Sequence, residues 1–140
     1  MNKRMTYALI VFGTVLTAGF MAARQHRVVI EVNIPGTEEW QAVLHNVVNL
    51  QQAFGIKSTS IEVVALGPGI GMVAKTDGEL QAQMQQLADS GVHFVACSNT
   101  MRALKMQPDD LLPFVKPVDS GAAEIVRKQE AGWAYLKGGK

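Results

Sequence analysis

A single cysteine, Cys97, supplies the only thiol in this chain of 140 residues. One thiol excludes an internal disulfide, and it also excludes the zinc sites that are built from several cysteines. An excess of charge of one sign is lacking as well, because 13 basic and 12 acidic residues nearly cancel. No cluster of Lys and Arg occurs in the body of the chain. This balance argues against a nucleic-acid-binding protein, which usually carries a basic face.

Charge is absent altogether from residues 5–23, and basic residues stand on both sides of this run. A basic start and an apolar core are typical of a secretory signal, whereas the length approaches the ~18 to 20 residues of a membrane span. Apolar residues surround the axis rather than forming a stripe, which disfavours a core helix. We therefore expect residues 1–25 to be a signal peptide or an N-terminal membrane anchor. Residues 26–140 should form one periplasmic domain, in contact with the inner membrane only through an uncleaved anchor.

Short apolar runs alternate with amphipathic segments throughout the domain. The runs predict strands at 27–34, 61–66, 92–96, 114–115 and 133–136. Helices are predicted from Thr37 to Gly55, from a capping box at Thr76 and Glu79 to Gly91, from just after Cys97, and from a cap at Asp119 or Ser120 to Gly132. This alternation predicts an α/β domain with a mostly parallel sheet of five strands and helices on both faces.

Cys97 follows the third predicted strand, at the edge where parallel sheets bind ligands. If a helix begins near Ser98, the unpaired backbone N–H groups of Ser98 and Asn99 would stabilise a thiolate there. A buried structural cysteine is an equally ordinary explanation of a lone thiol. The position at the end of a strand favours the functional interpretation slightly, and both remain open.

A glycine-rich segment, Gly67-Pro68-Gly69-Ile70-Gly71, follows the second predicted strand. It lacks the Lys-Ser/Thr ending of a phosphate loop and the spacing of a dinucleotide fingerprint, so a tight turn without phosphate is the better interpretation. Because this segment and Cys97 both follow strands at the same edge of the sheet, we expect Gly67 and Gly69 to form a wall of a pocket near the thiol.

The remaining polar residues predict no second site. His93 stands four residues before Cys97, about 13 Å along a strand at ~3.3 Å per residue, which is too far for it to act as a base, so we expect it to be packed. The three histidines do not share a metal-like spacing, and no metal or cofactor is expected. Trp40 and Trp133 are interpreted as core or subunit-contact residues, and Asp109-Asp110 as a helix cap.

Four segments carry a family resemblance: IEVVALGPGI, GVHFVACSNTM, DDLLPFV and SGAAEIVRKQEAGWAYL. In this order and spacing they resemble the DsrE/DsrF-like family of small sulfur-handling proteins, from about Val28 to Leu136. The resemblance implies a five-stranded α/β fold that assembles into trimers or hexamers. In members that relay sulfur, a cysteine after the third strand carries a persulfide and passes it to a partner, and Cys97 stands at that position.

Two functional hypotheses follow. In the first, the protein is a periplasmic persulfide carrier or sulfurtransferase, in which Cys97 accepts sulfur from a donor protein and passes it on, while Ser98 and Asn99 stabilise its charge. Without a second cysteine, a partner must release the sulfur. In the second, the protein is a non-catalytic oligomeric module that binds a ligand or partner in the pocket under Gly67 to Gly71, and Cys97 only packs. An electron carrier with flavin is a weak third hypothesis, because no flavin phosphate site is evident.

Overall fold

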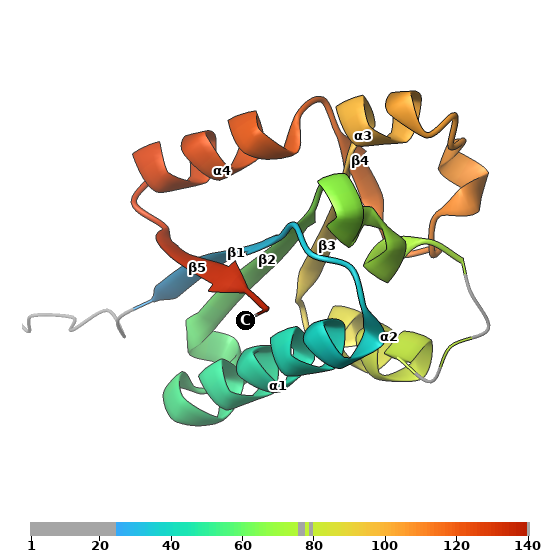
Figure 1. Cartoon of the computed structure of the whole chain (residues 1–140). Helices are drawn as coiled ribbons and strands as arrows, with labels where there is room; N and C mark the ends of the chain where they lie inside the picture. The colour runs from blue at the N-terminus through green and yellow to red at the C-terminus, as the bar shows by residue number, and fades with distance from the viewer. Residues whose placement is uncertain (1–24, 76–77, 79, 140) are drawn as a thin grey trace, which may run out of the picture.

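The computed structural model describes residues 25–75, 78 and 80–139, and its centre is a parallel sheet (Figure 1). Five strands pair in the order β4-β3-β2-β1-β5, and all four pairings are parallel. The strands are β1 (His26–Val32), β2 (Thr59–Ala65), β3 (His93–Cys97), β4 (Lys116–Val118) and β5 (Ala134–Gly138). The predicted α/β class and five-stranded sheet are therefore confirmed.

Helices cover both faces of the sheet. Helices α1 (Thr37–Phe54) and α2 (Leu80–Asp89) lie together on one face, and α4 (Gly121–Glu130) crosses the other (Figure 1). Helix α3 (Ser98–Ala103) continues directly from β3. Three short 3-10 helices complete the described elements: η1 (Ile56–Ser58), η2 (Gly67–Val73) and η3 (Pro108–Asp110).

The alternation of side chains along the strands divides the core in two. Val28, Ile30 and Val32 of β1 enter the larger cluster, together with Val43, Leu44 and Val47 of α1. Val29, Val64 and Val95 point to the opposite face and pack with Ile125 of α4. Cys97 stands two residues after Val95 and therefore belongs to the face that α4 covers.

Hydrogen bonds confirm one predicted helix cap and correct another. Ser120, rather than Asp119, is the N-cap of α4, and its Oγ accepts a hydrogen bond from Ala123 N at 3.3 Å. The cap predicted at Asp109-Asp110 is instead Gln107, and Asp110 is the third residue of η3, whose Oδ2 accepts a hydrogen bond from Gln107 N at 2.7 Å in a capping box. The predicted capping box at Thr76 and Glu79 lies outside the described residues.

The prediction of a fourth strand at Phe114 and Val115 is wrong, because the strand is Lys116–Val118. Phe114 instead packs edge-on against Phe94, with ring centres 5.6 Å apart, and Val115 is buried in the larger cluster. An edge strand tolerates lysine and proline, since one side of it needs no ladder hydrogen bonds. An apolar pattern was therefore a poor guide to this strand.

The predicted signal or anchor segment, residues 1–25, lies outside the described residues except for Gln25. In the part of the chain that is described, no helix combines the length and the apolar character that crossing a membrane requires.

Candidate functional site: a buried thiol between two helix starts

Cys97 is the last residue of β3 and the N-cap of α3, and only 4% of its surface is exposed. Its side chain faces the start of α4. A Cβ placed on Gly121 would lie 3.2 Å from Cys97 Cβ, 3.1 Å from Leu66 Cβ and 3.3 Å from Val64 Cγ1. The first residue of α4 therefore packs directly on the cysteine, and the absence of a side chain at Gly121 is what permits this approach.

The thiol is surrounded by hydrogen-bond donors from both helices. Burial by itself raises the pKa of the Cys97 thiol. Hydrogen bonds from the backbone N–H groups of Gly121, Thr100 and Asn99 and from the Thr100 hydroxyl lower it, and the resulting pKa lies below the ordinary value. The first N–H groups of a helix have no partner within the helix, so they are free to stabilise an anion. A thiolate at this position is thus buried and still hydrogen-bonded.

Thr100 connects the thiol to the segment after β2. Its Oγ1 accepts a hydrogen bond from Gly67 N at 2.9 Å. Because a hydroxyl has one hydrogen and this bond uses only a lone pair, the hydrogen remains available for the sulfur of Cys97. The segment after β2 therefore orients the Thr100 side chain toward Cys97 at the end of β3.

Gly67 and Gly69 are explained by their close approach to the end of β1. Gly67 has a φ of 50°, and a Cβ there would lie 2.3 Å from Asn33 Oδ1. A Cβ on Gly69 would lie 2.0 Å from Val32 O, which no side chain tolerates. These contacts account for both glycines, although the segment forms the 3-10 helix η2 rather than the tight turn expected from the sequence.

An open, mainly apolar depression of about 500 Å³ lies at the first turns of α3, and Cys97 itself is not among its lining residues. It is lined by Gly67, Pro68, Asn99, Thr100, Ala103 and Leu104. Gly67 and Asn99, two of the predicted binding residues, thus lie at one surface, whereas Gly69 and Ser98 are not among its lining residues. The side-chain amide of Asn99 already has a partner, because its Oδ1 accepts a hydrogen bond from Arg102.

Sequence reasoning missed Thr100 and Gly121. Thr100 stands within the first turn of a helix that the sequence did predict, one residue beyond Asn99, so its position in that turn was a signal for a further donor. Gly121 offers no local signal, because only the path of the chain through β4 returns it to Cys97. The second helix start was therefore invisible in the sequence.

The packing predicted for His93 is wrong, because its side chain is exposed. Strand β4 pairs with β3 only from Val95 onward, so no strand lies outside β3 at His93.

Trp40 packs against the larger core cluster and donates a hydrogen bond from Nε1 to Ile34 O at 2.8 Å, as expected of a core residue. Trp133 packs against the smaller cluster. Within residues 25–75, 78 and 80–139, no three His, Cys, Asp or Glu side chains are grouped to hold a metal ion.

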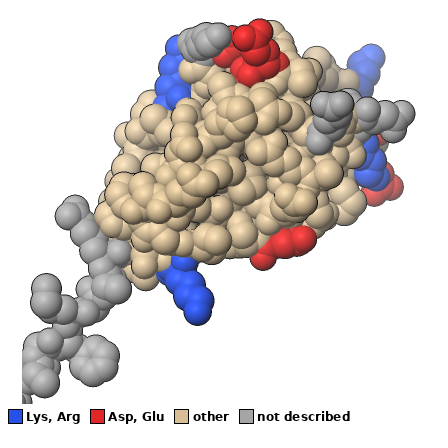
Figure 2. All heavy atoms as spheres, turned by 90° about the horizontal axis from the view of Figure 1, so that it is seen from below, with Lys and Arg blue, Asp and Glu red and all other residues tan. Residues whose placement is uncertain are grey.

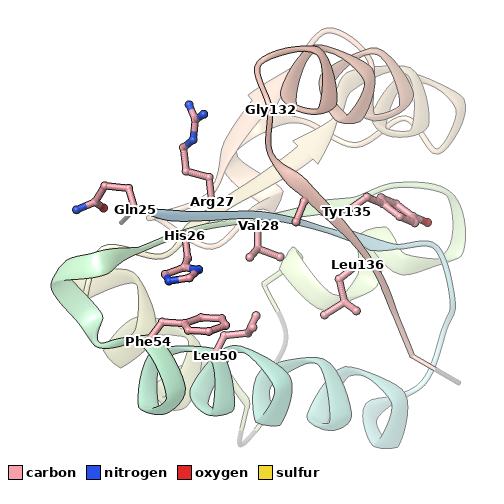
Figure 3. Close-up of a pocket in the computed structure, with 10 residues that line it drawn as sticks. Gln25, His26, Arg27, Val28, Leu50, Phe54, Gly132, Tyr135 and Leu136 are labelled. Carbon is pink, nitrogen blue, oxygen red and sulfur yellow. The ribbon is translucent and has the colours of Figure 1, made fainter. Parts of the chain in front are cut away.

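A separate pocket of about 370 Å³ lies between the start of β1, β5 and the end of α1 (Figure 3). His26 stacks on Phe54 there, with ring centres 3.9 Å apart. Tyr135 also lines it and donates a hydrogen bond to the Glu31 carboxylate, which raises the pKa of Tyr135 to about 12. Because all strands run in the same direction, this pocket is at the opposite end of the sheet from Cys97. Its lining residues include no cysteine, and the candidate site remains the thiol.

Comparison with known proteins places the chain among proteins of this fold. The profile of the DsrE/DsrF-like family matches residues 26–137. A solved protein of unknown function, MTH1491 from Methanobacterium thermoautotrophicum, is 39% identical, with 81% of this chain and 99% of that chain covered and a TM-score of 0.75. No curated protein matches the chain.

Two further structures share the fold at low identity. A conserved protein of unknown function, BT1422 from Bacteroides thetaiotaomicron, is 13% identical over 79% of this chain and 93% of that chain, with a TM-score of 0.61. The ychN protein from E. coli is 14% identical over 81% of this chain and 98% of that chain, with a TM-score of 0.60. These two support the architecture alone.

Proposed function

The chain belongs to the DsrE/DsrF-like family, which is related to sulfur relay in general, and from this premise we propose that it is a persulfide carrier that uses Cys97. The observation that carries the proposal is the set of backbone and hydroxyl donors around a buried thiol whose pKa is lowered. A thiolate is the form of cysteine that attacks sulfur, and donors of this kind stabilise it.

The proposed transfer has two balanced steps. The Cys97 thiolate attacks the outer sulfur of a donor persulfide, a new S–S bond forms, and the donor leaves as a thiolate with the electron pair of the broken S–S bond. An acceptor thiolate then attacks the outer sulfur held on Cys97, and the Cys97 thiolate leaves. The donors from Gly121, Thr100 and Asn99 stabilise negative charge on this sulfur before the first step and after the second. No net oxidation occurs, and neither step requires a metal or nucleotide.

Both partners are proposed to approach through the depression beside the thiol. Its lining includes Thr100, which is hydrogen-bonded to Cys97, and Leu104, which is 58% exposed. Because Cys97 is only 4% exposed and does not itself line this depression, a thiol partner must reach its sulfur past Asn99 and Thr100, which do. A donor and an acceptor thiol are both required, since Cys97 is the only cysteine of the chain.

We further propose that the protein works as a homo-oligomer, a trimer or hexamer, in the periplasm. The surface of α1 and α2 supports assembly of copies, because Figure 2 shows few charged side chains on this face. Glu38 and Glu39 are confined to the first turn of α1, and no basic residue stands in its last turn. Charge repulsion between identical copies is therefore small here. Export is supported by the uncharged run at residues 5–23.

Mass spectrometry of the intact protein tests the sulfur transfer. After incubation with a persulfide donor, we expect one added sulfur atom on the wild type and none on Cys97→Ser. Subsequent addition of a thiol acceptor should remove it. If several donors leave the folded protein unmodified while Cys97 still reacts with iodoacetamide, the carrier hypothesis is wrong. A thiol that stays inert until denaturation would favour the ligand- or partner-binding module instead.

A further inference from the structure

A partly buried polar cluster lies on the same face of the sheet as Cys97, under α4. Glu62 stands in the central strand β2 and is only 4% exposed. Lys128 Nζ lies 2.7 Å from Glu62 Oε2 and 3.6 Å from Glu124 Oε1. The same ammonium group lies 4.4 Å from the centre of the Trp133 ring. These contacts join the sheet to two successive turns of α4.

One oxygen of this cluster needs an explanation. Glu62 Oε1 is buried and has no hydrogen-bond donor as its partner. A buried carboxylate oxygen without a donor is costly, whereas a proton on Glu62 would turn this group into a donor. Glu124 is the nearby acceptor, because its carboxyl group and that of Glu62 flank the same ammonium group, at 3.6 Å and 2.7 Å from Lys128 Nζ, and each affects the pKa of the other. The orphaned oxygen is thus the place where a shared proton would reside.

The surroundings of the two carboxyl groups separate their acidities. Burial is the largest influence on Glu62, and its pKa is raised although Lys128 opposes the increase. Burial also acts on Glu124 to raise its pKa, but the hydrogen bonds and charges of Arg127, Lys128 and Glu62 outweigh it and lower the pKa. In such a pair the proton belongs to the more buried group and the charge to the other.

We propose that Glu62 and Glu124 share one proton, and that this proton keeps the first turns of α4 on the sheet and so holds the Gly121 N–H against Cys97. Glu124 follows Gly121 by one helical turn and Lys128 by two, about 10 Å in all at ~1.5 Å per residue. A helix segment this short moves as a unit, so the clamp at Glu62 sets the position of Gly121. The shared proton therefore makes the reactivity of the Cys97 thiol depend on pH. The biological role of this control rests on the proposed function.

Other charged groups near Glu62 belong to each neighbouring element. On β3, His93 is its register partner and is exposed; on β1 the partner is Val29, and Arg27 lies two residues before it on the same face. On the outer side of α4, Arg127 binds both Glu124 and Asp119. Lys116 on β4 is exposed and pairs with Val95. Exposed charges are screened by salt, so the ionisation of the buried Glu62 has the largest electrostatic effect on the position of α4.

Alkylation of Cys97 by iodoacetamide, measured as a rate constant against pH, tests the control without any sulfur donor. In Glu62→Gln the amide donates permanently to Glu124 and its oxygen still accepts from Lys128, so this variant mimics the protonated state. We expect two ionisations in the wild-type profile and one in Glu62→Gln. Between the Glu62 midpoint and the thiol pKa, the wild type should react about 3- to 10-fold more slowly, which corresponds to ~0.5 to 1 pKa unit.

Two matched controls isolate the buried carboxyl. Glu130→Gln makes the same charge change on the same helix at an exposed position, and it should leave the wild-type profile intact. His93→Gln removes the imidazole that is the register partner of Glu62 on β3, and the two ionisations should persist. Hydrogen exchange of the Gly121 amide, compared between wild type and Glu62→Gln at equal pH, reports the movement of α4 itself and should be faster in the wild type.

Each outcome decides the proposal. A single ionisation in the wild type that Glu62→Gln does not alter overturns it, and so does a carbon-13 NMR titration in which Glu62 ionises at or below 4.5. If Glu62→Gln changes the alkylation rate of Cys97 but not the exchange rate of the Gly121 amide, the charge of Glu62 acts on the thiol directly. That result would refute the positioning of α4. If Glu62→Gln fails to fold, the wild-type profile and the NMR titration still decide. If the wild type shows two ionisations in its alkylation profile but does not transfer sulfur, the persulfide-carrier function is refuted and the control by Glu62 is not.

Discussion

Substitution of Thr100 by valine removes one donor from the thiolate and leaves the shape of the side chain nearly unchanged. The hydroxyl that disappears has two partners, since it accepts a hydrogen bond from Gly67 N at 2.9 Å and donates to Cys97. The backbone donors of Gly121, Thr100 and Asn99 remain in the variant. The change therefore tests a single contribution to the acidity of the thiol.

The magnitude follows from the charge of the acceptor. A hydrogen bond to a charged group contributes about 1.5 to 3 kcal/mol, and 1.36 kcal/mol corresponds to one pKa unit. Because Cys97 is 4% exposed, water replaces little of the lost bond, and we expect its pKa to rise by about one to two units. The N–H of Gly67 also loses its acceptor, so the free energy of unfolding should fall by about 1 kcal/mol, the low end for a group that is only half-buried.

Iodoacetamide alkylation against pH measures the first effect, and urea denaturation measures the second. Thr100→Ser is the matched control, because it restores the hydroxyl and should keep a thiol pKa close to that of the wild type. A folded Thr100→Val protein with an unshifted thiol pKa would refute the argument that the hydroxyl of Thr100 stabilises the thiolate. The backbone N–H donors alone would then account for the lowered pKa of Cys97.

Two further predictions concern the glycine-rich segment and the buried carboxyl. Gly69→Ala should lower the free energy of unfolding by about 3 kcal/mol or more in urea denaturation, because its Cβ would lie 2.0 Å from Val32 O; a loss below about 1 kcal/mol would contradict this contact. Glu62 has a folded pKa raised above 4.5, so the native state binds more protons than the unfolded state between these two pKa values. The free energy of unfolding of the wild type should therefore fall relative to Glu62→Gln as the pH rises from about 4.5 through the folded pKa, and level off above it. A difference that is independent of pH would contradict this prediction.

Local patterns were sufficient for most of the elements. The helix from Thr37 to Phe54 agrees with the apolar spacing of its sequence, and the start of α3 directly after Cys97 agrees with the change from apolar to polar residues there. Periodicity of this kind reports which face of a segment is buried, and it needs no knowledge of the partner. The element types and their parallel arrangement were accessible for this reason.

The errors occurred where burial depends on a neighbour. His93 continues an apolar run, and its exposure results from the late start of β4 beside β3. Lys116 and Pro117 form a strand because they lie at the edge of the sheet, although their own composition does not favour one. Strand order decided both cases, and strand order is a property of the whole sheet.

The amino-acid sequence by itself determined the α/β alternation and the position of a lone thiol at the carboxyl end of the third strand, since both depend on residues that are neighbours along the chain. Only the tertiary structure decided which groups surround that thiol. Gly121 reaches Cys97, and Lys128 reaches Glu62 across 66 residues of sequence, because α4 folds back over the sheet. Hydrogen bonds and burial act over a few ångströms of space, so the acidity of a buried group is set by contacts that no local pattern contains.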